Sequence, residues 1–149
     1  MKLSLPRFRD LGWIFLLTGI YFAAGKFGLS LAFVNASASG VWPPTGLSLA
    51  ALLILGPQMW PAVFAGAFLV NLTTAGTFVT SLGIAAGNTL EAVIGAFLIQ
   101  RFAGGRDTAD QTSGVFKFIV FEMAATMIAA TIGVATLLLG SLARPVAPR

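Results

Sequence analysis

Long apolar runs, separated by short segments of small, polar or helix-breaking residues, make up most of the chain. The runs at 11–34, 77–100 and 115–140 are each long enough to cross a bilayer, because about 20 helical residues span the hydrocarbon core. Two further runs, 46–55 and 61–72, are shorter. The pattern therefore predicts an all-α integral membrane protein with about five transmembrane helices, of which the second and third are short and hairpin-like.

The two short central runs allow two arrangements. They fold back on each other through Gly56-Pro57-Gln58, either as two thin, tilted spans, which we favour, or as one re-entrant hairpin. Irregular backbone at membrane depth is tolerated only where protein buries it or where it lines a wet cavity. Trp42-Pro43-Pro44 precedes them and predicts a stiff elbow at the mouth of a pocket, because proline fixes its own φ and restricts the preceding residue.

Three parts follow from this pattern. Residues 1–10 form a basic cytoplasmic lead, residues 11–140 form the multi-span membrane region, and residues 141–149 form a tail. Five crossings give an odd count, and the tail is basic. We therefore expect either that further sequence normally follows or that the chain is a fragment.

Composition strengthens the membrane assignment. The chain is 57% hydrophobic and only 9% charged, whereas an ordinary globular domain carries about 25% charged residues. Its mean hydropathy is +0.91. The net charge of +4 is not arranged as a basic stripe, so we expect no nucleic-acid partner. Cysteine and histidine are absent, which excludes disulfides, thiol chemistry and imidazole-based metal sites.

The basic residues also indicate an orientation. Lys2, Arg7 and Arg9 precede the first span, and five crossings place Arg101 and Arg106 on the same side of the membrane. The loops expected on the other side contain neither Lys nor Arg. Cytoplasmic loops carry the excess of basic residues, so the N-terminus is predicted to be cytoplasmic.

Three ionisable residues fall inside predicted spans, namely Lys26, Glu91 and Glu122. Each costs about 2.5–3.5 kcal/mol at the centre of a membrane helix, so such residues normally face a partner or a cavity. Glu122 lies nearer a cytoplasmic end, where snorkelling or pairing with Lys117 or Arg101 explains it.

Four polar residues share a middle depth and could meet: Lys26, Asn71, Asn88 and Glu91. Asn88 and Glu91 lie at i and i+3 and so share a helix face. One interpretation is a site for a small ligand or ion, with Glu91 as acceptor and Lys26 as counter-ion. The favoured and plainer interpretation is a structural lock, in which Lys26 pairs with Glu91 and the amides bridge helices.

Small residues recur every four positions around this acid, at Gly83, Gly87 and Gly95. Small residues at this spacing let membrane helices approach closely. The spacing predicts that Glu91 lies on a tightly packed face, away from lipid.

Three segments together resemble a known family. They are WPPTGLSLA (42–50), WPAVFAGAFLVNL (60–72) and SLGIAAGNTLEAVIGAFL (81–98). In this order and spacing they are similar to the membrane-associated sensor domain of the first type. That domain forms the N-terminal membrane part of bacterial sensor histidine kinases and diguanylate cyclases. The similarity runs over about 21–102 and covers the N-terminal part of the family pattern.

The resemblance implies a helical sensory module in the bacterial inner membrane. Such a module passes a signal to a cytoplasmic output domain in two-component or cyclic di-GMP signalling. Its expected partners are the lipid bilayer, neighbouring helices or a second copy, and an output domain such as a histidine kinase or diguanylate cyclase. The resemblance supplies no catalytic residue, and it leaves the cofactor unknown. The ligand-binding candidates are Lys26, Asn35, Trp42, Thr45, Asn71, Asn88 and Glu91.

Three functions were weighed. The leading one is a sensory module that perceives a small ligand or membrane state. Broken short helices and mid-membrane polar residues also suit a transporter or channel subunit, and small-residue faces suit a structural subunit of a larger membrane complex. Enzyme activity is not expected, because the sequence predicts no nucleophile and base that would come together.

Overall fold

The computed structural model describes residues 7–31, 42–74, 76–103 and 112–142, and within these ranges the chain is helical without strands. The five helices are α1 (Leu11–Ser30), α2 (Pro43–Ile54), α3 (Trp60–Leu72), α4 (Phe78–Phe102) and α5 (Thr112–Leu142). Two single 3-10 turns, η1 (Phe8–Asp10) and η2 (Pro57–Met59), precede α1 and α3. The predicted all-α class is confirmed.

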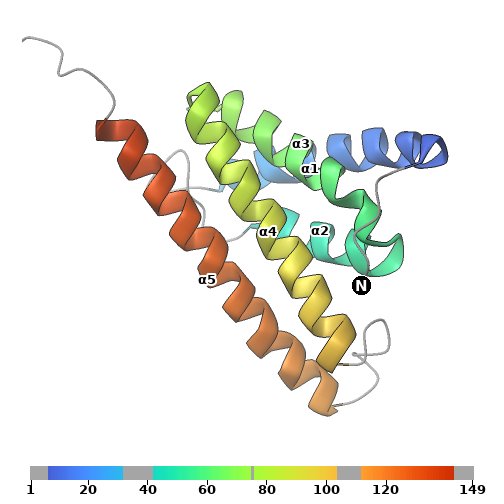
Figure 1. Ribbon diagram of the computed structural model, residues 1–149. Helices are drawn as coiled ribbons and strands as arrows, with labels where there is room; N and C mark the ends of the chain where they lie inside the picture. The colour runs from blue at the N-terminus through green and yellow to red at the C-terminus, as the bar shows by residue number, and fades with distance from the viewer. Residues whose placement is uncertain (1–6, 32–41, 75, 104–111, 143–149) are drawn as a thin grey trace, which may run out of the picture.

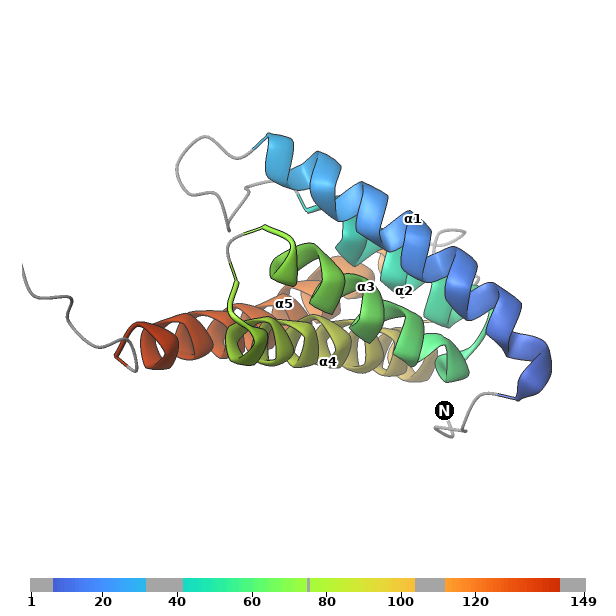
Figure 2. The same cartoon turned by 90° about the horizontal axis from the view of Figure 1, so that it is seen from above.

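The helices form three layers (Figure 2). α1 is one outer layer, α2 and α3 form the middle, and α4 and α5 form the other outer layer. α4 and α5 run antiparallel and side by side (Figure 1). α4 contacts α2, α3 and α5, whereas α1 packs on α2 and α3. α4 is therefore the helix on which most of the fold is built.

Three helices are long and apolar enough to cross a membrane: Phe8–Ser30, Phe78–Phe102 and Gly114–Gly140. α2 and α3 contain 12 and 13 residues. At about 1.5 Å per residue they rise roughly 18 and 20 Å, which is less than the hydrocarbon thickness of about 30 Å. The second and third helices are thus short, as predicted, and neither reaches across a bilayer of ordinary thickness on length alone.

Local sequence explains where these helices begin and end. Pro43 and Pro44 occupy the first turn of α2, where a missing N–H has no consequence because first-turn N–H groups lack helical partners. The expected elbow is therefore the start of a helix. α2 ends before Gly56, whose φ of 104° is the left-handed region that favours glycine. Thr77 caps α4, because its hydroxyl accepts from the backbone N–H of Thr80.

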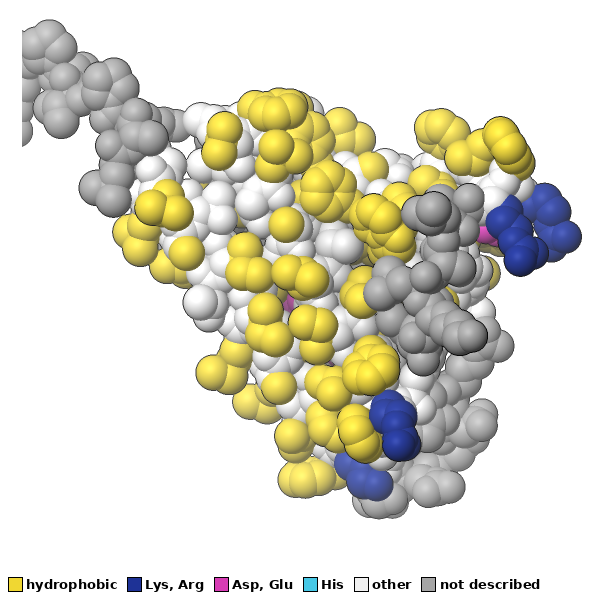
Figure 3. Space-filling model, in the orientation of Figure 1, with side chains coloured by type: hydrophobic (Ala, Val, Ile, Leu, Met, Phe, Trp, Pro, Cys, Tyr) yellow, Lys and Arg dark blue, Asp and Glu magenta, His cyan; other side chains and the backbone are white. Residues whose placement is uncertain are grey.

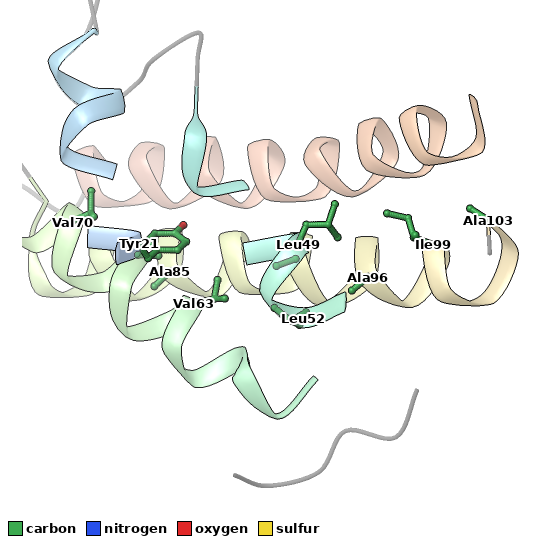
Figure 4. Close-up of a cluster of buried hydrophobic side chains, with 11 residues drawn as sticks. Tyr21, Leu49, Leu52, Val63, Val70, Ala85, Ala96, Ile99 and Ala103 are labelled. Carbon is green, nitrogen blue, oxygen red and sulfur yellow. The ribbon is translucent and has the colours of Figure 1, made fainter. Parts of the chain in front are cut away.

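The apolar core lies where α2 and α3 meet α4 (Figure 4). Leu52 of α2 and Ile99 of α4 are fully buried, and Val63 of α3 and Tyr21 of α1 are 3% exposed. Each of the first four helices contributes a side chain to this cluster. Burial of apolar area stabilises such packing by about 25 cal/mol per Å2 where the alternative is water, and close fit contributes the rest inside a bilayer.

The outer faces of α1 and α5 are apolar and exposed. Only 17% of the α1 span and 11% of the α5 span is buried inside the structure. Large apolar side chains such as Phe15, Phe116 and Met127 are about 70% exposed or more. Hydrophobic side chains cover the face of α4 and α5, and basic side chains gather at two places near its edge (Figure 3). This surface is suited to acyl chains, as expected of a multi-pass membrane protein.

We predict that Gly66→Val destabilises the packing of α1 on α3. A Cβ added at Gly66 would lie 2.8 Å from three atoms of the Tyr21 side chain, which is too close without a backbone shift. Overpacking of this kind costs about 1–3 kcal/mol. The free energy of unfolding in detergent micelles measures the loss. Gly19→Val is the matched control, because a Cβ added at Gly19 in α1 meets no atom within 4 Å. Equal losses in both variants would contradict the prediction.

Candidate functional site

Glu91, in the middle of α4, is only 4% exposed. Its Oε1 atom accepts a 2.6 Å hydrogen bond from the Thr126 hydroxyl of α5 and a 3.5 Å hydrogen bond from the Thr45 hydroxyl of α2. Within the described residues these two hydroxyls are the hydrogen-bond partners of the carboxylate, and neither is charged. One buried carboxylate oxygen therefore joins three helices.

Close approach of α4 and α5 buries this acid. Gly87 lies one turn before Glu91, and a Cβ added there would be 3.3 Å from the backbone oxygen of Ala129. Gly95 lies one turn after it, and a Cβ added there would be 2.5 Å from a carboxylate oxygen of Glu122. Larger residues at either position would separate the helices, so the four-residue spacing has the packing role that the sequence suggested.

A cavity of about 310 Å3 lies beside Glu91. Its polar and aromatic lining draws on four helices and the residue before α2, namely Trp42, Thr45, Asn71, Asn88, Glu91 and Thr126. Its remaining lining is apolar and comes from Ile84 of α4 and from α5, which contributes Ala129, Ala130, Gly133, Val134 and Leu137. Sites for small ligands typically combine an apolar wall with a few polar groups in this way.

The two asparagines of the cavity differ in how they are held. Asn71 is 7% exposed, and its amide donates a 2.8 Å hydrogen bond to the backbone oxygen of Ala67 in its own helix. Asn88 is half-buried and forms no hydrogen bond with another described residue. Its amide, which can both donate and accept, therefore remains available to a ligand beside Glu91.

Trp42 connects the cavity to the first helix. It lines the cavity and also packs against the buried cluster that contains Tyr21 of α1. Trp42 therefore lies between the site and the core of the fold.

Lys26 lies elsewhere. Its Nζ atom donates to the backbone oxygen of Thr73 at 2.9 Å and to the hydroxyl of Thr74 at 2.8 Å, and it lies 5.6 Å from the centre of the Phe22 ring. The expected Lys26–Glu91 pair is therefore not formed. The last carbonyls of a helix lack helical partners and carry partial negative charge, so the end of α3 attracts this cation. Counting residues along the first span predicts how deep Lys26 lies in the membrane, but it does not predict the direction in which its side chain points.

Glu122 is the residue whose surroundings differ most from expectation. Both of its carboxylate oxygens are buried and have no hydrogen-bond partner within the described part of the chain. Its carboxylate oxygens are thus not exposed at the protein surface, and they do not pair with Lys117 or Arg101. It packs against Gly95 and lies close enough to Glu91 for the two carboxylates to interact electrostatically.

Five of the seven predicted site residues line the one cavity, namely Trp42, Thr45, Asn71, Asn88 and Glu91. Lys26 does not line it, and Asn35 lies outside the described residues. Sequence reasoning missed Thr126, whose position four residues after Glu122 places both on one face of α5. No group of three acidic, histidine or cysteine side chains that could hold a metal gathers within the described ranges.

Comparison with known proteins places the chain in a family. The MASE1 family model matches residues 13–146, which includes all five helices except the first two residues of α1. Searches of curated proteins and of solved structures gave no significant match. The match covers nearly the whole chain and agrees with its apolar helices, so the chain belongs to MASE1, a family of membrane-associated sensory domains.

Proposed function

We propose that this domain is a sensory input module whose cavity binds a small ligand and thereby regulates a cytoplasmic output domain. The observation that carries the proposal is the buried Glu91 carboxylate, which is hydrogen-bonded from two other helices at the edge of a cavity of about 310 Å3. Membership of a sensory family supports the same conclusion.

The geometry suggests how binding would be transmitted. Thr126 and Thr45 donate to the same carboxylate oxygen from α5 and α2, at 2.6 Å and 3.5 Å. The longer bond is at the limit of hydrogen-bond geometry, so a ligand donor could replace it at little cost. A ligand shifts a conformational equilibrium only by binding one state better than the other. Here the two states would differ in how α2 and α5 are joined to α4.

The proposed setting is the bacterial inner membrane with a cytoplasmic N-terminus. The distribution of Lys and Arg supports this orientation. The output domain would be a histidine kinase or a diguanylate cyclase, which places the module in two-component or cyclic di-GMP signalling. A change of the packing between α4 and α5 is the signal that such a domain would receive.

Transport is a second candidate function. α2 begins and α3 ends at the cavity, through Thr45 and Asn71. Transporters also place the ends of broken helices at sites in mid-membrane. Ligand-dependent flux through the purified protein in proteoliposomes would favour this function over sensing, and its absence together with ligand-dependent output would favour sensing.

We predict that Glu91→Gln uncouples sensing while the protein still folds. The amide keeps the size of the side chain but loses the charge, so the site loses its charge-assisted hydrogen bonds. The response of a fused diguanylate cyclase or kinase domain to its stimulus should fall about tenfold or more. Asp10→Asn is the control, because it removes the same charge outside the cavity. Loss of membrane insertion in Glu91→Gln alone would instead support the structural lock.

We predict that Gly133→Leu blocks the response by filling the cavity. Gly133 lines the cavity, and a Cβ added there meets no atom within 4 Å. Leucine also has a higher helix propensity than glycine, so the free energy of unfolding should not fall. Gly19→Leu is the matched control, since Gly19 also has open space around it but lies in α1, away from the cavity. A normal response in Gly133→Leu would contradict a role for the cavity.

A further inference from the structure

The cavity contains the carboxyl group of Glu91, to which no described residue supplies a cation. Glu91 is 4% exposed and its described partners are two hydroxyls. Lys26, which the sequence suggested as the counter-ion, donates instead to the end of α3. Glu122 of α5 lies in the interface between α4 and α5, close to Glu91, and adds a second acidic side chain there, not a basic one. A buried carboxylate normally needs a partner of opposite sign, and the described part of the chain does not supply one to Glu91.

The volume and the lining residues of the cavity indicate what kind of ligand could occupy the space beside Glu91. Its volume of about 310 Å3 is roughly ten times the 30 Å3 that one water occupies, so a bare metal ion would leave it mostly empty. Small aliphatic side chains of α5 form much of the apolar lining, among them Ala130 and Val134. Both are exposed, so the cavity opens along α5, on the surface that faces the acyl chains.

Two more groups that line the cavity, the amide of Asn88 and the indole of Trp42, suit a cationic group that is attached to an apolar part. The amide oxygen of Asn88, which forms no hydrogen bond within the described chain, can accept from an ammonium group. The Trp42 indole lines the same cavity, and indole rings attract cations within about 6 Å.

We propose that the ligand is a small amphiphilic organic cation, whose ammonium group binds Glu91 and Asn88 and whose apolar part rests on α5. This inference rests on the proposed function and specifies the chemical class that the site recognises. The ligand reaches the cavity from the bilayer, along the open side at α5.

Three probes of nearly equal shape test the class. Cyclohexylmethylammonium, cyclohexylmethanol and cyclohexanecarboxylate are titrated against the full chain in uncharged detergent micelles. Trp42 emission reports binding, and Trp42→Phe identifies its contribution beside those of Trp13 and Trp60. The ammonium should bind saturably, the alcohol about tenfold or more weakly, and the carboxylate not at all. Glu91→Gln should weaken ammonium binding by about ten- to a hundredfold, whereas Asp10→Asn should not change it.

Gly133→Leu provides a second test that does not depend on Glu91→Gln folding. It should abolish ammonium binding, whereas Gly19→Leu should retain it. Equal binding of alcohol and ammonium, unchanged binding in Glu91→Gln or Gly133→Leu, or no saturable ammonium binding at all would each reject the proposed ligand class. Alcohol binding in the cavity would leave the proposed function standing. Selective ammonium binding, with normal output from Glu91→Gln, would keep the ligand class and reject the proposed function.

Discussion

The burial of a carboxyl group among helices, where the described residues offer it only hydroxyl groups, is the constraint on which this structure depends. Glu91 has no described cationic partner, yet it is 4% exposed. A charge in this position is expensive and is tolerated only when neighbouring helices present polar groups to it. Thr45 and Thr126 do so from α2 and α5. The positions of these two helices on α4 are therefore set partly by one side chain.

Close packing makes that arrangement possible. Gly87 and Gly95 lie one turn on either side of Glu91 and bring α5 near enough for Thr126 to reach the acid. In lipid, helices gain little from burying apolar area, so fit and interhelical hydrogen bonds decide how they associate. The two glycines that permit the hydrogen bond between Thr126 and Glu91 therefore also favour one particular packing of α4 against α5.

Much of the fold could be predicted from the sequence, because length and hydropathy decide membrane helices almost by themselves. The five runs became five helices, and the two central ones are short. The boundary at Pro43 was missed because proline was interpreted as a turn residue, although it is also favoured in the first turn of a helix. Most of the candidate site residues could also be picked out from the sequence, since Asn88 and Glu91 stand out in an apolar run, and these two line the cavity.

What the sequence could not give was the direction in which each polar side chain points. Lys26 and Glu91 were assigned to similar depths, yet the lysine binds the end of α3 instead. Thr126 looked ordinary because threonine is common in membrane helices and carries no charge. Both depend on how the helices are rotated about their axes, which is a property of packing and is not encoded in the hydropathy of any single run.

α5 differs from the other four helices in how few helices it packs against. Lys26 joins α1 to the end of α3, Trp42 packs against the core cluster that includes Tyr21 of α1, and the same cluster joins these helices to α4. α5 shares an extensive interface with α4 and with no other described helix. α5 is therefore attached to the rest of the molecule through a single neighbour, whereas each of the other four helices packs against at least two. The short hydrogen bond between Thr126 and Glu91 lies within that one interface.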